Sequence, residues 1–419
     1  MAKKRKVHSL TGRITFPLVY AAWRRVRRNR GAAGIDKVSI KMFAANLDEN
    51  LQALMRDLKD GSLEPKPLRR VYIPKDAKRT KFRPLGIPAV RDRVAQEVIR
   101  RLLEPIFEPL FHDNSFGFRP GRCCHQAVEQ VLSYHKQGDR VTLDADISGF
   151  FDNIPHRVIM KAVAHEVADG NILRLVEKFL RAGVMENGVF KPTNIGTPQG
   201  GVISPLLANI ALNHLDWRLH EAGYRFVRYA DDFVVASRTH RQAEQALALV
   251  ERVVTELGLA LSPEKTKIAT YGKGYEFLGF HLSSRSRRMR PKSVERFKTK
   301  IRELTRRLHN LDAKAVEKLN QVIRGTASYF ATSFSTCRRH FLALDKWIRM
   351  RVRCMKLKRK SCHDTCKLRM VYFRKLGLLN LSDFVRNGGV QARSVIPCSG
   401  PSLGGRPVRE IRTPVNRGN

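Results

Sequence analysis

The amino-acid sequence predicts an α+β fold that is followed by a helical, strongly basic domain. Two short β-rich runs, residues 226–229 and 233–236, flank a tight Ala-Asp-Asp turn, and this pattern is typical of a β-hairpin. An amphipathic helix follows, with apolar residues at spacings of three and four from Ala243 to Leu257, and Gly258 ends it. The mixture of strands and helices predicts an α+β sheet domain.

The rest of the first 285 residues supplies the other elements of this domain. Runs rich in β-branched and aromatic residues predict strands, and apolar residues at helical spacing predict helices. Glycine and proline between the runs predict turns. In chain order, the sequence predicts helical structure at 15–60 with a turn at 31–36, a strand at 71–74, a basic tip at 75–83, a helix at 94–103, a strand that bends at 141–154 and a strand at 277–280.

The composition changes after about Arg285. Residues 294–308 carry one apolar helical stripe, while lysines and arginines occupy the other faces. The stripe is formed by Val294, Phe297, Ile301, Leu304 and Leu308. Residues 349–375 hold eleven Lys or Arg and a single acid, Asp364. The predicted division is a basic leader at 1–8, the sheet domain at 9–285, a helical basic domain at 286–378 and a short basic tail at 379–419.

The charge balance is the strongest global signal. The 419 residues include 79 Lys or Arg and 38 Asp or Glu, a formal net charge of +41. An excess of this size repels itself unless a polyanion neutralises it, so nucleic acid is the predicted partner and binding should depend strongly on salt. A solvated basic surface is the alternative.

Three features concern the compartment. No run of about 18 apolar residues occurs, so no membrane span is predicted. The seven cysteines are scattered through a large chain, which indicates a reducing, intracellular setting. Residues 3–7 resemble a short basic nuclear-import signal, and an ordinary basic tail is the alternative. The predicted location is cytoplasmic, or nuclear if residues 3–7 act as an import signal.

Three carboxylates are the candidate catalytic groups. Asp231 and Asp232 lie at the tip of the predicted hairpin, and Asp146 lies where the strand within 141–154 ends. A turn can direct two adjacent carboxylates to one point, and two divalent cations about 3.5–4 Å apart can then activate a hydroxyl and stabilise a leaving phosphate. An all-oxygen ligand set suits Mg²⁺. The alternative is an ordinary turn, since Asp often bonds its own backbone there.

Eight segments, taken in order, resemble the sequence blocks of bacterial group II intron reverse transcriptases, also called maturases. The resemblance runs from about Trp23 to Leu379. It implies a right-hand polymerase, with fingers and an antiparallel palm sheet at 9–285 and a helical basic thumb at 286–378. The segments are 34–36, 72–88, 115–122, 146–152, 196–206, 229–232, 262–267 and 277–280.

The resemblance implies a two-metal site. Asp146, Asp231 and Asp232 would hold two Mg²⁺ ions, for which Mn²⁺ can substitute, and the backbone carbonyl of Ile147 would be a further ligand. Lys265 would protonate the pyrophosphate leaving group, and an ordinary surface lysine is the alternative.

The resemblance also implies a site for the incoming deoxynucleotide. Lys75 and Arg83 would hold the triphosphate, since an arginine can bind phosphate oxygens through two hydrogen bonds. Phe151 falls where a bulky side chain excludes a ribose 2′-hydroxyl, and an ordinary core aromatic is the alternative. Gln199, which two glycines follow, would lie in a loop close to nucleotide and template, or in a simple turn.

Basic residues in two regions are predicted to bind nucleic acid. Residues 116–122 combine two phenylalanines with two arginines in a pattern that can stack bases and hold phosphates, although the aromatics could equally be core residues. In the helical domain, cations project from the faces opposite the apolar stripe. The predicted contacts are Arg119, Arg122, Lys298, Arg302 and Arg306.

The predicted function is that of an RNA-directed DNA polymerase, and the resemblance implies a second role in intron splicing and mobility. The predicted partners are an RNA template with a DNA or RNA primer, deoxynucleoside triphosphates, group II intron RNA and target DNA. Cys362 and Cys366 have no second cysteine pair at zinc-site spacing, so an endonuclease domain is not expected and residues 379–419 are read as a remnant of a DNA-binding region. The alternatives are a non-enzymatic RNA-binding splicing maturase and a retron-like or CRISPR-associated defence reverse transcriptase.

Overall fold

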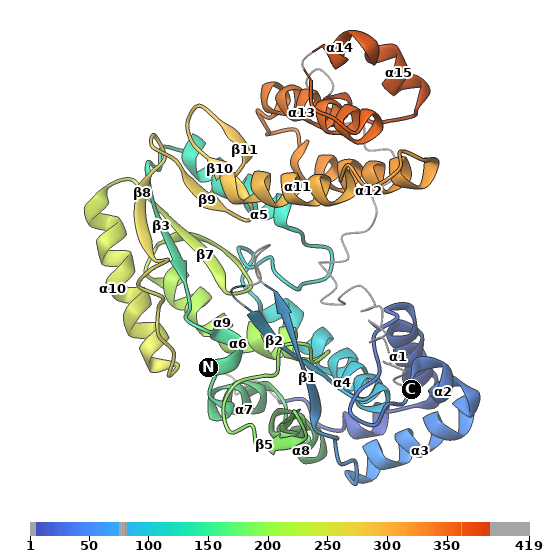
Figure 1. Cartoon of the computed structure of the whole chain (residues 1–419). Helices are drawn as coiled ribbons and strands as arrows, with labels where there is room; N and C mark the ends of the chain where they lie inside the picture. The colour runs from blue at the N-terminus through green and yellow to red at the C-terminus, as the bar shows by residue number, and fades with distance from the viewer. Residues whose placement is uncertain (1–5, 75–79, 81, 362, 386–419) are drawn as a thin grey trace.

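The helices within residues 16–60 lie together at one end of the molecule (Figure 1). The computed structural model describes residues 6–74, 80, 82–361 and 363–385. Val19, Trp23 and Val26 form the buried stripe of the first helix, which confirms the predicted helical region and its turn at 31–36. The elements are η1 (Thr11–Arg13), α1 (Phe16–Arg28), α2 (Ile40–Ala45) and α3 (Leu47–Asp60), which pack together with α4 (Val90–Phe107).

One four-stranded sheet has the strand order β2-β1-β4-β5. Of the basic tip predicted at 75–83, residues 75–79 and 81 lie outside the described residues. β1 (Leu68–Pro74) and β2 (Phe82–Ile87) pair antiparallel as a hairpin, and the strand predicted at 71–74 is confirmed as the end of β1. β1 also pairs parallel with β4 (Val184–Glu186), which pairs antiparallel with β5 (Val189–Lys191).

The central sheet is antiparallel and has the strand order β6-β7-β3-β8. β6 (Arg225–Tyr229) and β7 (Asp232–Ser237) form the predicted hairpin. β3 (Val141–Asp146) pairs with β7, and β8 (Lys267–Thr270) pairs with β3 on its other side. The prediction of an antiparallel palm sheet is thereby confirmed.

Helices cover both faces of the central sheet. The helices of this part are η2 (Glu108–Leu110), α5 (Cys124–Lys136), α6 (Phe150–Asn153), α7 (His156–Glu166), α8 (Gly170–Arg181), α9 (Ser204–Glu221) and α10 (His240–Glu256). On one face, α9 and α10 pack on Leu143, Phe226 and Phe233. On the other face, α5 packs on Val227 and Val234. Side chains alternate between these two faces along each strand.

The helical C-terminal part follows a small antiparallel sheet in the order β11-β10-β9, and Figure 1 shows it at the end of the molecule opposite α1–α3. The elements are β9 (Tyr275–Phe277), β10 (Phe280–Leu282), β11 (Arg287–Met289), α11 (Pro291–Leu304), α12 (Ala313–Phe330), α13 (Arg338–Leu357), α14 (Asp364–Lys367), α15 (Met370–Lys375) and η3 (Leu381–Phe384). The predicted boundary between residues 285 and 286 falls inside the β10–β11 hairpin. Over the described ranges, no helix has the length and apolar character needed to cross a membrane.

Two local predictions are wrong, and both errors concern where an element ends. The predicted strand at 277–280 is a hairpin, in which Leu278 and Gly279 form a two-residue turn with φ of 45° and 85°. Positive φ at both central residues is typical of a type I′ turn, and the apolar sequence concealed it. Leu308 is not on the apolar stripe, because α11 ends at Leu304 and Leu308 is 92% exposed.

A second hydrophobic core joins the α5 face of the central sheet to the helical part. Val227 and Val234 contribute to it from the hairpin, and Phe280 is fully buried within it. The ring centroid of Phe280 lies 5.6 Å from that of Tyr329 on α12. His125 of α5 donates from Nε2 to the Tyr329 carbonyl oxygen at 2.8 Å. Packed side chains therefore hold the helical part on the sheet.

Phe280→Ala should lower the free energy of unfolding by about 3–5 kcal/mol, because a buried ring is lost and a cavity remains. Urea denaturation followed by circular dichroism measures the change. Leu308→Ala is the matched control and should stay within about 0.5 kcal/mol of wild type, because Leu308 is exposed. Equal stability of the two variants would contradict the packing around Phe280.

Candidate active site

Three carboxylates lie next to one another at one end of the central sheet. Asp146 ends β3 and pairs in register with Asp232, the first residue of β7, and Asp231 lies beside it in the β6–β7 turn. Asp144 precedes Asp146 by two residues and so shares its face of the sheet. Val234 lies two residues after Asp232 and packs with side chains of α5 in a hydrophobic core. The carboxylates therefore lie on the face of the central sheet that α5 covers.

Burial, together with neighbouring negative charge, raises the pKa values of Asp144, Asp231 and Asp232. Loss of hydration, and then the negative charges of Asp231, Asp146 and Asp144, raise the pKa of Asp232 to about 7. Burial raises the pKa of Asp144 to about 6, and burial also raises the pKa of Asp231, with the charge of Asp146 adding to both shifts. Carboxylates that repel one another in this way form a place for a cation.

Lys265 supplies positive charge at this place. Its Nζ donates to Oδ2 of Asp146 at 2.5 Å, and this hydrogen bond raises the pKa of Lys265. Among the residues that the structure describes, no three His, Cys, Asp or Glu side chains converge closely enough to make a ready metal site. The donors nevertheless fit divalent cations, since all are carboxylate oxygens on adjacent backbone positions. A cation at Asp146 would take the place of the Lys265 ammonium.

The main chain after Asp146 has an orientation that suits its predicted role. Ser262 donates to the Asp146 carbonyl at 2.8 Å, and Ser148 donates to the Ala260 carbonyl at 2.9 Å. These bonds flank Ile147 and its partner on the neighbouring strand, so the N–H and C=O of Ile147 point away from that strand. They point instead to the side of β3 on which β7 and the turn lie. The role of Ile147 as a metal ligand stays a prediction.

The turn between β6 and β7 has a left-handed residue and a glycine packed against it. Ala230 has a φ of 60°. A Cβ atom added at Gly117 would lie 2.3 Å from the backbone nitrogen of Ala230. Phe116 donates to the Arg228 carbonyl at 2.9 Å, which holds this loop along β6. A side chain at position 117 would therefore push the loop and the turn apart.

Two residues predicted to contact the nucleotide lie in neighbouring segments. Phe151 is half-buried and packs edge-on against Phe118, with ring centroids 6.3 Å apart. The carbonyl of Gln199 accepts a hydrogen bond from Gly86 at 2.7 Å, and its side chain donates to Asp152 at 3.3 Å. The Gln199 loop is thereby tied to β2 and to the α6 region.

Of the two cations predicted to hold the triphosphate, the structure describes Arg83. Arg83 is exposed on β2, opposite Ile73. Burial raises the pKa of Asp231 and the charge of Arg83 opposes that rise, so the guanidinium lies within electrostatic range of the carboxylates. Lys75 lies outside the described residues. Arg83 thus connects this hairpin electrostatically to the end of the central sheet.

One predicted nucleic-acid contact is wrong. Arg119 is 7% exposed, and its guanidinium donates to the Glu108 carboxylate at 2.9 Å. The same guanidinium donates to the carbonyls of His112 and Ser115 at 2.7 and 2.8 Å. Arg119 therefore fixes its own loop, and its donors are engaged by the protein.

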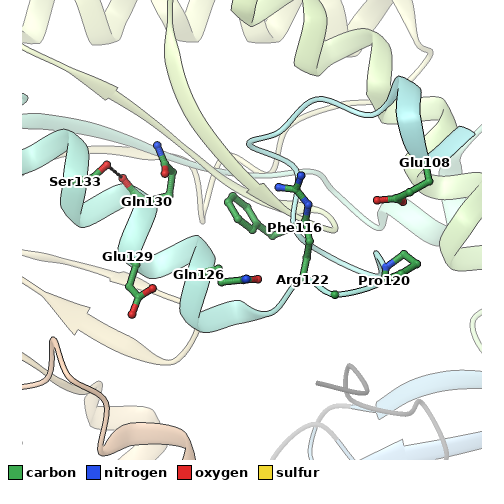
Figure 2. A pocket seen from close by; sticks show the side chains of 9 residues that line it. Glu108, Phe116, Pro120, Arg122, Gln126, Glu129, Gln130 and Ser133 are labelled. Atoms are coloured by element: carbon green, nitrogen blue, oxygen red, sulfur yellow. Dashed lines mark hydrogen bonds between the residues drawn. The ribbon is translucent and has the colours of Figure 1, made fainter. Parts of the chain in front are cut away.

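Arg122 lines a cavity of about 640 Å³ between residues 108–122 and α5 (Figure 2). Its guanidinium lies over the Phe116 ring at 5.4 Å and donates to the Asp113 carboxylate at 2.8 Å. Among the described lining residues, Arg122 is the one cation and two are acids, Glu108 and Glu129. The cavity itself has no excess of positive charge to attract a phosphate, so a role of Arg122 in nucleic-acid binding stays a prediction.

The predicted contacts of the helical part lie on α11 or just after it. Lys298 and Arg302 both lie over the Trp347 ring, at 5.8 and 5.7 Å, and Arg302 also pairs with Glu295. Arg306 is exposed beyond the end of α11. Cations stacked on an aromatic face form a defined basic surface rather than a set of freely moving charges.

A buried polar cluster beneath the turn was not among the predicted sites. Arg228, Asp216 and Asn209 are at most 1% exposed. They join β6 to α9 through hydrogen bonds between their side chains. The available signal was an arginine inside an apolar strand, since a buried cation requires an acidic partner.

The central antiparallel sheet sets acidic residues side by side at its end, with a basic hairpin beside it and basic helices after it. This arrangement defines a template-directed nucleic-acid polymerase. Residues 73–282, half of the chain, match the reverse transcriptase (RNA-dependent DNA polymerase) family. The chain belongs to this family, whose members use divalent metal ions. Residues 294–371 match the maturase-specific domain of group II introns, which confirms the resemblance predicted from the sequence.

Proteins of several organisms are similar to this chain. YkfC of Escherichia coli (strain K12) is 37% identical over 288 residues, which cover 59% of this chain and 75% of YkfC. The group II intron-encoded protein LtrA of Lactococcus lactis subsp. cremoris is 36% identical over 253 residues, 60% of this chain and 41% of LtrA. Nuclear intron maturase 2, mitochondrial, of Arabidopsis thaliana is 25% identical over 308 residues, 61% of this chain and 41% of that protein. The chain therefore spans less than half of the last two relatives.

Gly117→Ala should lower the rate of primer extension by about 100-fold, because a new Cβ must displace Ala230 and with it the neighbouring aspartates. Single-turnover extension on an RNA template measures the rate. Gly170→Ala is the control, since an added Cβ at Gly170 meets nothing within 4 Å. Its rate should stay within about twofold of wild type. Full activity of Gly117→Ala would show that the turn tolerates the displacement.

Asp232→Asn should stabilise the protein at high pH. The pKa of Asp232 is raised to about 7, so the folded state keeps a proton that the unfolded state releases near pH 4. Wild type therefore loses stability as the pH rises from about 4 to about 7, whereas the neutral asparagine does not. Thermal melting with a chelator should give equal melting temperatures near pH 4 and a more stable variant above about pH 7. A difference that does not change with pH would contradict the raised pKa.

Proposed function

We propose that this reverse transcriptase extends a primer 3′ end by nucleotidyl transfer at Asp146, Asp231 and Asp232. The observation that carries the proposal is the in-register pairing of Asp146 with Asp232, beside Asp231 in the turn. The proposed cofactors are two Mg²⁺ ions, for which Mn²⁺ can substitute, because the donors are all oxygen anions. When bound, such ions activate the primer hydroxyl and stabilise the leaving pyrophosphate.

The protein's own groups bind and orient the reactants in this proposal. Arg83 and Lys75 hold the triphosphate of the incoming deoxynucleotide, and Phe151 excludes a 2′-hydroxyl. Gln199 positions the loop next to the template, and the carbonyl of Ile147 completes the ligand set. Lys265 is the proton donor to the pyrophosphate. The support for Lys265 is its ammonium at 2.5 Å from Asp146, which puts a proton beside the carboxylates.

The proposed partners are nucleic acids. Arg122, Lys298, Arg302 and Arg306 are the proposed contacts with an RNA template and its DNA or RNA primer. Group II intron RNA and target DNA are further proposed partners, with splicing and mobility of the intron as the second role. The match of residues 294–371 to a maturase-specific domain supports this role, as does the similarity to LtrA, a group II intron-encoded protein.

Two alternatives differ in what they leave out. A non-enzymatic RNA-binding maturase needs the helical part but does not require three adjacent carboxylates. The presence of these carboxylates therefore favours the polymerase. A retron-like or CRISPR-associated reverse transcriptase does not require a maturase-specific domain, so the match of residues 294–371 to that domain disfavours this alternative. The domain limits 1–8, 9–285, 286–378 and 379–419 stay predictions. A cytoplasmic location, or a nuclear one directed by residues 3–7, also stays a prediction.

Asp231→Ala should lower primer extension by about 1,000-fold or more, because a proposed cation ligand is lost. Binding of the RNA–primer duplex should not change, since no basic residue is altered. Extension with Mg²⁺ and filter binding at the same salt concentration measure the two effects. Asp60→Ala, at the exposed end of α3, is the matched control and should behave as wild type.

The outcomes separate the candidates. Primer extension at the wild-type rate by a pure Asp231→Ala preparation would contradict the proposed active site. Binding without any extension by wild type, on RNA and DNA templates alike, would favour the non-enzymatic maturase.

A further inference from the structure

Arg228 is a fully buried arginine in β6, and none of the roles above uses it. Its neighbours Val227 and Tyr229 point to the α5 face of the central sheet, because side chains alternate along a strand. Arg228 therefore points to the α9 face, away from Asp146 and Asp232. Burying a cation without a hydrogen-bonded partner costs free energy, so the partners of Arg228 indicate what it does.

The charge of Arg228 is paired with Asp216 of α9. Nε and Nη2 donate to the two carboxylate oxygens at 2.7 and 2.6 Å. Both residues are 0% exposed. Because a two-point bond fixes the angle as well as the distance, the pair sets the position of β6 on α9.

The remaining donors of Arg228 reach the catalytic turn. Nη1 donates to the Ala230 carbonyl at 3.0 Å and to Oδ1 of Asn209 at 2.9 Å. The Ala230 carbonyl belongs to the peptide that joins Ala230 to Asp231. Asn209 in turn donates from Nδ2 to the carbonyl of Gly117 at 2.8 Å, and Gly117 packs against the turn. One guanidinium thus holds the turn directly and through the glycine loop.

We propose that Arg228 is a positioning residue that acts through the Ala230 carbonyl to align the catalytic turn with Asp146. The inference rests on the proposed function of the three carboxylates. Arg228 touches no reacting atom, since it lies on the opposite face of the sheet. Its effect falls on the ligands of the cations and on the chemical step, and binding of the nucleic acid does not depend on it.

The shape of arginine is essential to this arrangement. The planar guanidinium presents donors to Asp216, Asn209 and Ala230 at once, whereas a lysine ammonium carries three donors on a single atom. A lysine can neutralise Asp216 but cannot span all three partners. Arg228→Lys therefore keeps the positive charge and removes the planar guanidinium, so it separates the effects of the two.

The test avoids leaving one charge buried alone, because that would destabilise the fold. The main variant combines Arg228→Met with Asp216→Leu, so that both charges are removed and most of the volume is kept. The matched control combines Arg225→Met with Asp139→Leu. This second pair is also an arginine of β6 with a buried aspartate, 3.2 Å apart, at the end of the strand away from the turn.

The expected result is a catalytic loss without a binding loss. The main variant should lose about 100-fold in kcat and need about tenfold more Mg²⁺ for half-maximal rate, since the ligands are misplaced. Its Kd for the RNA–primer duplex should stay within about twofold, and so should the kcat of the control pair. Arg228→Lys should lose kcat as the main variant does. Thermal melting verifies that each variant is folded.

Two results overturn the proposal. One is an unchanged kcat and Mg²⁺ dependence in the folded main variant, and the other is full activity of Arg228→Lys. If the main variant does not fold, Arg228→Lys decides, because it keeps a positive charge beside Asp216 but cannot also reach the Ala230 carbonyl. A kcat about 100-fold below wild type in the folded Arg228→Lys variant supports the proposal, and a normal kcat overturns it. Activity of Asp231→Ala would instead remove the proposed function itself.

Discussion

The ion pair between Arg228 and Asp216 is the interaction on which the catalytic end of the central sheet depends. Taking two charges out of water costs several kcal/mol per ion, and only a fully hydrogen-bonded arrangement offsets this. Here both carboxylate oxygens and the carbonyl of Ala230 are bonded at 3.0 Å or less. A shift of β6 by one residue would turn Arg228 to the other face and leave Asp216 unpaired. The same pair therefore specifies the strand register and supports the turn.

The two faces of the central sheet have different chemistry because side chains alternate along its strands. The α9 face is closed, and it holds Arg228 within an apolar surrounding. The α5 face carries Asp146 and Asp232 at the end of the sheet, where burial and then the neighbouring negative charges raise the pKa of Asp232 to about 7. A single hairpin thus presents a buried structural cation on one side and reactive anions on the other, with the sheet between them.

Sequence patterns predicted the parts of this structure that depend on local chemistry. The β6–β7 hairpin and α10 followed from periodicity, and the three aspartates followed from the order of the motifs. The turn at Leu278 and Gly279 was missed, because Leu278 stands at the first turn position, where asparagine, aspartate or glycine is the usual signal. Arg119 was assigned wrongly because its loop folds so that the guanidinium bonds Glu108 and nearby carbonyls of the same segment. Arg228 was overlooked because its partner Asp216 lies on another element, twelve residues away.

The second hydrophobic core runs without interruption from the strands of the catalytic hairpin into the helical part, and Phe280 lies within it. A core that crosses a predicted domain limit leaves neither side with a complete set of buried contacts. The two sides then form one cooperative unit, in which local opening on one side weakens the other. The helices that carry the basic surface and the strands that carry the carboxylates should share a single melting transition, although the sequence suggests two domains.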